Sequence, residues 1–286
     1  MRAKIRDTEI YFDVEGSGLV ADGPRMREKP VMFLLHGGPG ADHSSYKPTF
    51  SPLSQKVQLV YFDHRGQGRS ARGDKQTYTL ESNVEDMEAL RQHLGLDKIV
   101  VLGSSYGGMV ALSYACRYPH RVSHLIVVAT ASNYRFLQKA QEILAERGTP
   151  EQQTIAQRLW DGNFETEAQL AEYFAVMGSM YSLTHDPQAT QARWDRSIFS
   201  VDAINMAFGG FLRSYDVSQQ LHTITSPTLV IGGRHDWICP PEFSEEIAQA
   251  IPNADLRIFE QSGHSIRADE PEALLEAIVG FLVYKR

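Results

Sequence analysis

A serine stands between two glycines at a point where the sequence changes from a strand-like to a helix-like pattern. The motif Gly103-Ser104-Ser105-Tyr106-Gly107 follows the apolar run at 99–102 and precedes a helical pattern over 108–118. A sharp turn of this kind lifts the Ser105 hydroxyl clear of a sheet, and the flanking glycines avoid clashes with neighbouring backbone. The helix behind the serine aims its N–H groups at developing negative charge. The motif therefore predicts a nucleophilic Ser105; the alternative is a glycine-rich turn with an incidental serine.

A nucleophilic serine needs a base, and the base needs an acid that orients it. His264 and Asp236 each lie shortly after an apolar run that indicates a strand. Because parallel strands bring their carboxyl ends to one edge of a sheet, we expect both side chains near Ser105. His235 competes as the base and Asp269 as the acid. His235 adjoins the predicted acid and Asp269 opens a helical pattern, so we predict the order Ser105, Asp236, His264 for the catalytic residues.

A second glycine-rich segment, His36-Gly37-Gly38-Pro39-Gly40, follows another apolar run. Bare backbone here allows an N–H group to face a substrate oxyanion, while Pro39 stiffens the turn. We predict that the N–H groups of Gly38 and Tyr106 form this oxyanion hole, each contributing about 3–4 kcal/mol of transition-state stabilisation. The alternative is a turn that binds no ligand. Further candidates for contact with substrate are Gly37, Trp237 and Phe208.

Other motifs in the sequence give no sign of a cofactor. His120 and His124 are four apart, but Pro119 and a following strand pattern keep them off a shared helical face, which disfavours a metal site. The sequence contains no glycine-rich phosphate-binding motif at the start of a helix. Cys239 is interpreted as a packing residue. We therefore predict a reaction without metal or organic cofactor.

Short apolar runs alternate with helical patterns at both ends of the chain. The strand-like runs lie at 31–35, 57–62, 99–102, 125–128, 228–231 and 256–259, and helical patterns lie at 80–94, 243–251 and 271–282. Near-continuous apolar runs are typical of strands buried on both faces. The alternation predicts an α/β fold with a mostly parallel, doubly wound sheet.

The middle of the chain differs from both ends. From about 132 to about 216 the sequence shows helical patterns, dense in aromatic residues and methionines, and no strand-like run. These side chains form either a helical core or part of a substrate pocket beneath a lid. We predict a core domain formed by 1–131 and 217–286, interrupted by an all-helical cap at 132–216. Because the predicted catalytic residues lie on both sides of the insertion, the two core segments must form one unit.

The composition narrows the possible partners and compartment. The 286 residues are 42% hydrophobic and 22% charged, as expected of a globular protein, and the formal net charge of −7 disfavours nucleic-acid binding. The chain has two cysteines, a polar start and no apolar run of about 20 residues. We predict a cytoplasmic protein that acts on a small molecule and has no membrane partner. The sequence does not indicate an oligomeric state.

Taken together, the motifs resemble the α/β-hydrolase superfamily across nearly the whole chain, and within it the proline iminopeptidase branch. The motifs that carry the resemblance are His36 to Gly40, Asp63-His64-Arg65-Gly66-Gln67-Gly68-Arg69-Ser70, Gly103 to Gly107, Gly233-Arg234-His235-Asp236 and Ser262-Gly263-His264-Ser265. The resemblance implies the α/β-hydrolase fold, a cap over the active site and a serine hydrolase that releases an N-terminal residue, proline or similar, from small peptides or amino-acid amides. Relatives with the same motifs include esterases, amidases and lactonases. A small-molecule carboxylesterase or lactonase is therefore the alternative, and a non-catalytic ligand-binding protein is a minor one.

The sequence departs from this branch in one respect. Prolyl aminopeptidases are expected to hold the free amino group of the substrate with acidic residues of the cap or the pocket edge. The segment 204–211 contains no acid, and Glu172, Asp195 and Asp202 are interpreted as residues of solvated helix faces. The aminopeptidase specificity thus rests on the resemblance and not on carboxylates identified in this chain.

Overall fold

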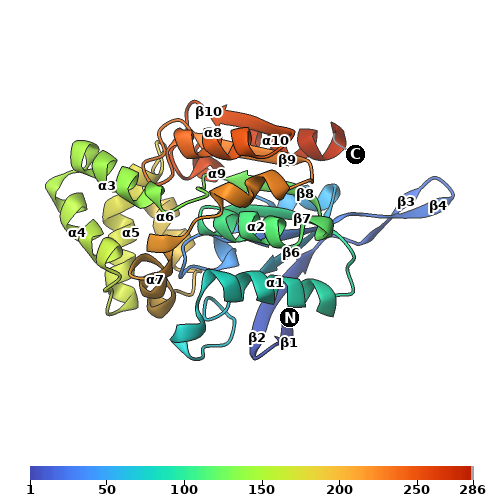
Figure 1. Ribbon diagram of the computed structural model, residues 1–286, viewed down its shortest axis with the longest axis horizontal. Helices are drawn as coiled ribbons and strands as arrows, with labels where there is room; N and C mark the ends of the chain where they lie inside the picture. The colour runs from blue at the N-terminus through green and yellow to red at the C-terminus, as the bar shows by residue number, and fades with distance from the viewer. Residues whose placement is uncertain (285–286) are drawn as a thin grey trace.

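An eight-stranded sheet runs through the centre of the computed structural model, which describes residues 1–284 (Figure 1). Its strands are β1 (Arg2–Ile5), β2 (Thr8–Glu15), β5 (Val31–Leu35), β6 (Gln58–Phe62), β7 (Ile99–Ser104), β8 (Val122–Val128), β9 (Thr228–Gly233) and β10 (Ala254–Phe259). The strand order is β1-β2-β6-β5-β7-β8-β9-β10, and all neighbours from β6 to β10 pair in parallel. The predicted mostly parallel sheet is confirmed.

Helices cover both faces of this sheet. They are α1 (Leu80–His93), α2 (Tyr106–Arg117), α8 (Pro241–Ala250), the short α9 (Ile266–Asp269) and α10 (Pro271–Tyr284). Phe33 and Leu35 of β5 belong to the core packed with α1, α2 and α8, whereas Met32 and Leu34 belong to the core packed with α10. Burial on both faces explains why the parallel strands are near-continuous apolar runs, and it confirms the doubly wound arrangement.

Strands also form near the start of the chain, where the sequence analysis named none. β1 and β2 pair antiparallel at one edge of the sheet, and β3 (Leu19–Asp22) with β4 (Arg25–Glu28) forms a separate hairpin that extends from the body (Figure 1). In β1, Ala3 and Ile5 are buried while Arg2 and Lys4 are exposed. Apolar and charged residues alternate in β1, so the strand contains no continuous apolar run of the kind that predicted the parallel strands.

Five α-helices lie between β8 and β9, beyond one end of the sheet (Figure 1). We call them the inserted helices: α3 (Arg135–Arg147), α4 (Pro150–Asp161), α5 (Glu167–Tyr181), α6 (Pro187–Trp194) and α7 (Val201–Phe208). An antiparallel bridge between Asn133 and Asp216 brings the two ends of the insertion together. In the described part of the chain, none of the helices is long and apolar enough to span a membrane.

Candidate active site

Ser105 occupies a tight turn between β7 and α2. Its backbone has φ +55° and ψ −123°, a region that side-chain-bearing residues rarely adopt. The Ser105 N–H donates a hydrogen bond to the Val128 carbonyl at 2.9 Å, which ties the turn to β8. A Cβ at Gly103 would collide with the carbonyl of Gly107, and a Cβ at Gly107 would collide with the carbonyl of Leu35. The motif therefore has glycine where the backbone segments approach one another too closely for any side chain.

Asp236 and His264 form a buried pair on the loops after β9 and β10. The Asp236 Oδ2 atom lies 2.7 Å from His264 Nδ1, and Asp236 Oδ1 accepts hydrogen bonds from the N–H groups of Ile238 and Cys239, each at 2.9 Å. Asp236 is 1% exposed and His264 is 8% exposed. A carboxylate facing Nδ1 places the ring proton on that nitrogen, so that Nε2 is left to accept a proton.

Ser105 and His264 line the same cavity, whose volume is about 430 Å³. Gly37, Gly38, Tyr106 and Phe208 also line it. Within residues 1–284, the Ser105 hydroxyl makes no hydrogen bond, either to His264 or to any other group. Such catalytic contacts often form only when substrate closes the site.

Both residues predicted to form the oxyanion hole line this cavity. Tyr106 is the first residue of α2, so its N–H has no acceptor within the helix. Gly38 has φ +119°, and a Cβ there would lie only 3.0 Å from the nitrogens of Gly40 and Ala41. The loop that carries Gly38 is fixed to the start of α7, because the Ser200 N–H donates to the Gly40 carbonyl at 2.8 Å. The arrangement leaves N–H groups available to an oxygen bound near Ser105.

Trp237 does not line the cavity. It is fully buried, and its ring packs edge-on against Trp160 and Tyr181, with ring centroids 6.1 and 5.5 Å apart. Tyr181 does line the cavity, and its ring also contacts His264. Trp237 thus supports the wall from behind, and the geometry gives no support to its predicted contact with substrate.

The two competitors of the predicted base and acid have other surroundings. His235 is exposed to solvent. Asp269 accepts hydrogen bonds from Ser182 Oγ at 2.6 Å and from the Gly263 N–H at 2.8 Å, so it joins the end of α5 to the loop of His264. Neither residue pairs with His264 in the described part of the chain.

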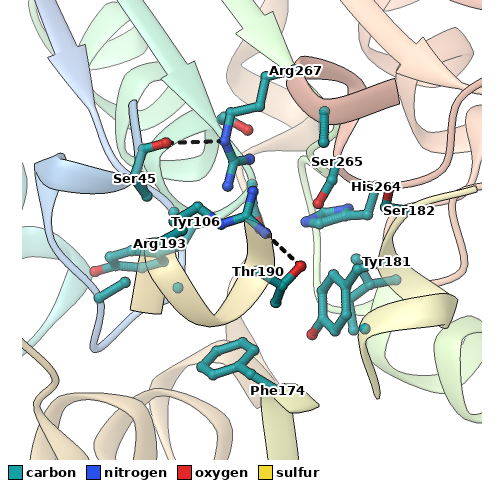
Figure 2. A pocket seen from close by; sticks show the side chains of 18 of the residues that line it. Ser45, Tyr106, Phe174, Tyr181, Ser182, Thr190, Arg193, His264, Ser265 and Arg267 are labelled. Atoms are coloured by element: carbon teal, nitrogen blue, oxygen red, sulfur yellow. Dashed lines mark hydrogen bonds between the residues drawn. The ribbon is translucent and has the colours of Figure 1, made fainter. Parts of the chain in front are cut away.

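Two arginines in the cavity were not identified by the sequence analysis. Arg193 on α6 and Arg267 on α9 both line it, and their guanidinium groups lie close together beside His264 (Figure 2). Burial and the nearby charge of Arg267 lower the pKa of Arg193 to about 10, and burial also lowers the pKa of Arg267. No motif surrounds either residue, because each meets the other only through the fold.

Few acidic side chains line the cavity. Among the described residues, Asp186 is the one carboxylate that lines it, and this side chain is exposed. Asp186 caps α6, because its Oδ1 accepts from the N–H groups of Gln188 and Ala189 at 2.8 and 3.3 Å. The three acids that the sequence analysis assigned to solvated faces are exposed and lie outside the cavity lining: Glu172, Asp195 and Asp202.

Comparisons with known proteins give a consistent result. A model of the alpha/beta hydrolase fold family matches residues 30–271. The chain is 31% identical to the proline iminopeptidase PfmaB of Pestalotiopsis fici, over 94% of this chain and 97% of that protein. It is similar in structure to an esterase from Exiguobacterium antarcticum, with a TM-score of 0.77 and 23% identity over 99% of this chain and 98% of the other. A proline iminopeptidase from Mycobacterium smegmatis gives a TM-score of 0.77 and 20% identity over 99% and 97%.

Proposed function

Because the chain belongs to the alpha/beta hydrolase fold family and is a hydrolase, we propose that it cleaves its substrate through an acyl-enzyme formed on Ser105. One observation carries this proposal. His264, which pairs with the buried Asp236 at 2.7 Å between Nδ1 and Oδ2, lines the same cavity as Ser105 with its strained turn. A serine, an oriented imidazole and free backbone donors are the groups that acyl transfer requires.

In the proposed mechanism, Ser105 Oγ attacks the substrate carbonyl while His264 Nε2 takes the hydroxyl proton. Asp236 stabilises the imidazolium that forms, and the N–H groups of Gly38 and Tyr106 hold the oxyanion. His264 then gives its proton to the leaving group, and the Ser105 ester remains. A water deprotonated by His264 attacks this ester and releases the acid product. No step is assigned to a metal or an organic cofactor.

We also propose that residues 132–216 act as a cap on a core formed by 1–131 and 217–286. Side chains of α5, α6 and α7 line one part of the cavity, and the loops after β5, β7 and β10 line another. A substrate in the cavity would therefore be enclosed by both units. The proposed compartment is the cytoplasm, in keeping with the free thiols of Cys116 and Cys239.

The first candidate substrate is a small peptide or amino-acid amide that loses its N-terminal residue, proline or a similar one. The similarity to proline iminopeptidases over most of the chain favours this class. Such a substrate carries an ammonium group next to the scissile bond, and Asp186 is the carboxylate in the described cavity lining that could face it.

The second candidate is a small ester or lactone cleaved by the same residues. It is favoured by the cavity itself, which contains two arginines and one exposed carboxylate among the described lining residues. An ammonium group close to Arg193 and Arg267 would meet like charge, whereas an ester has no charge to accommodate.

A fluorophosphonate probe and a substrate panel test these proposals. The probe is expected to label the unaltered protein at Ser105, and not the Ser105→Ala variant. Absence of labelling in folded protein would remove the acyl-enzyme proposal and favour a non-catalytic ligand-binding protein. The panel compares prolyl and other aminoacyl arylamides with N-blocked analogues and p-nitrophenyl esters. Turnover of free aminoacyl amides alone supports the first candidate, and turnover of esters and N-blocked substrates alone supports the second.

A further inference from the structure

Two positive side chains from separate parts of the chain meet in the cavity that contains Ser105. Arg193 comes from the end of α6, one of the inserted helices, and Arg267 comes from α9, directly after the loop of His264. Figure 2 shows the two guanidinium groups facing one another in the cavity, with His264 at one side. Any substrate that reaches Ser105 therefore lies near two positive charges.

Among the described residues, neither arginine has a carboxylate partner. Arg193 Nη2 donates to Thr190 Oγ1 at 3.3 Å, while its Nε is buried without any hydrogen-bond partner. Arg267 Nε donates to the Ser45 carbonyl at 3.3 Å. In residues 1–284, no carboxylate oxygen lies within ion-pair distance of either guanidinium. Both guanidinium groups thus retain N–H donors that are not used by any group of the described chain.

The charged groups around the pair do not neutralise it. Arg196 adds a further positive charge near Arg193. Asp269 attracts Arg267 from a distance, but its oxygens already accept hydrogen bonds from Ser182, Thr184 and Gly263. Two partly buried like charges that face one another without an anion are unfavourable. An anion placed between them would satisfy the donors and remove the repulsion.

We propose that Arg193 and Arg267 bind a carboxylate of the substrate, so that the enzyme acts on an ester or amide with a free carboxylate group. The planar guanidinium fork matches a carboxylate with two parallel hydrogen bonds. The proposal rests on the proposed acyl transfer by Ser105, because it places the carboxylate in that cavity. The carboxylate lies either on the acyl part or on the leaving part, as at the C-terminus of a dipeptide.

Paired substrates with and without the charge test this inference. On the acyl side, the p-nitrophenyl hemiester of glutaric acid is compared with its methyl-capped, neutral counterpart. On the leaving side, 4-carboxyphenyl acetate is compared with its methyl-capped counterpart. Each kcat/KM value is expressed as the ratio of unaltered enzyme to variant, which removes the difference in intrinsic reactivity.

Arg193→Gln and Arg267→Gln are each expected to lower kcat/KM for the charged member of at least one pair by about 10- to 100-fold, mainly through KM. The neutral member is expected to change by less than about threefold. Arg196→Gln is the matched control, because Arg196 is exposed and does not line the cavity. It removes the same charge nearby and is expected to leave both ratios close to unity. An effect confined to one pair assigns the carboxylate to the acyl or the leaving side.

Equal losses for charged and neutral substrates, or no loss in either pair, would overturn the proposal of a carboxylate site. Labelling of Ser105 by the fluorophosphonate probe would still support the acyl-enzyme in that case. Failure of Ser105 labelling instead removes the proposed function, so the two failures are distinguishable. If the variants fold poorly, inhibition of the unaltered enzyme still tests the proposal. Glutarate is expected to inhibit hydrolysis of the neutral ester competitively, and glutaramide at the same concentration is not. Equal behaviour of these two compounds would also overturn the proposal.

Discussion

The turn after β6 and the cavity beside the inserted helices both contain arginines that are wholly or partly buried, but of the two only the turn has its arginine paired with carboxylates of the described chain. Arg65 lies 2.7 Å from Asp86 on α1 and 2.7 Å from Asp7, and its side chain is 4% exposed. In the cavity, Arg193 and Arg267 face one another without a carboxylate partner among the described residues. A fully paired arginine holds structure in place, whereas an unpaired one at a cavity wall is available to a ligand.

The residues proposed to be catalytic show the same contrast between paired and unpaired groups. Asp236 uses both carboxylate oxygens on protein groups, whereas the Ser105 hydroxyl and the N–H groups of Gly38 and Tyr106 have no such partner in the described residues. The supporting groups are satisfied and the groups that would touch substrate are not. We therefore expect substitutions to separate into losses of stability and losses of activity.

The largest expected effect is on activity. Ser105→Ala removes the nucleophile and should lower kcat by about 10⁶-fold, since the remaining groups cannot form the acyl-enzyme. Steady-state or single-turnover rates on a p-nitrophenyl ester measure it, and circular dichroism checks that the fold is retained. Asp236→Asn should lower kcat by about 10⁴-fold, because the amide NH2 would face His264 Nδ1, favour the wrong tautomer of the ring and supply no negative charge to stabilise the imidazolium. Near-normal turnover by Ser105→Ala would contradict the proposed mechanism.

The second effect is on stability, at the paired arginine. Asp86→Ala leaves Arg65 buried beside the exposed Asp7 alone, and it also removes the 2.8 Å contact of Arg6. The free energy of unfolding, from urea titration, should fall by about 3–5 kcal/mol. The preference for carboxylate-bearing over neutral esters should not change. A changed preference would show that the two regions are not independent.

Asp7→Ala is the control for this prediction. Asp7 contacts the same Arg65, but its side chain is 65% exposed, so its loss should lower the free energy of unfolding by less than about 1 kcal/mol. The hydrogen bond from Arg65 lowers the pKa of Asp7 to about 2. A carboxyl group whose pKa is lowered on folding stabilises the protein above its ordinary pKa of 3.8, and this contribution is lost as the pH falls towards 2. The difference between the unaltered protein and Asp7→Ala should therefore shrink as the pH falls below 3.8 and disappear once it is below about 2.

The third effect is also on stability, and its expected sign is opposite to that of Asp86→Ala. Arg193→Met removes an unpaired, partly buried charge beside Arg267, although it also removes the stacking of the guanidinium on Trp194. The free energy of unfolding should stay constant or rise by up to about 1 kcal/mol. Urea titration with and without glutarate measures both parts of the prediction, since stabilisation by glutarate should be lost. A decrease above about 2 kcal/mol would mean that Arg193 has a structural role like that of Arg65.

The fold was largely predictable because strands that are buried on both faces have near-continuous apolar sequences. The apolar run at 99–102 lies within β7, and the helical pattern over 80–94 matches α1. β1 and β2 were harder to predict, because these antiparallel strands mix charged and apolar residues and contain no near-continuous apolar run.

The candidate site was predictable only in part, for a different physical reason. Local motifs constrain backbone at Ser105 and after β5, where close packing admits nothing but glycine. Arg193 and Arg267 have no such constraint on their neighbours in sequence. Their relation depends on how the fold brings α6 and α9 to the same cavity, and a buried charged residue at a helix end is indistinguishable in sequence from an exposed one. The candidate catalytic residues could therefore be proposed from the motifs, and the charge of the cavity could not.

The smallest expected effect separates the two candidate substrates. Asparagine caps helices about as well as aspartate, so Asp186→Asn keeps the cap of α6 while it removes the one negative charge on the described cavity lining. If the cavity serves a carboxylate, kcat/KM for prolyl arylamide and for the charged esters should change by less than about threefold, because Asp186 is exposed and its charge is screened. If Asp186 instead holds a substrate ammonium group, KM for the arylamide should rise at least about tenfold, with the esters unaffected. Asp195→Asn, a neighbouring exposed acid outside the cavity, is the matched control. A selective rise in KM for the arylamide would assign substrate recognition to Asp186 instead of the arginine pair, and it would favour a reaction that removes an N-terminal residue.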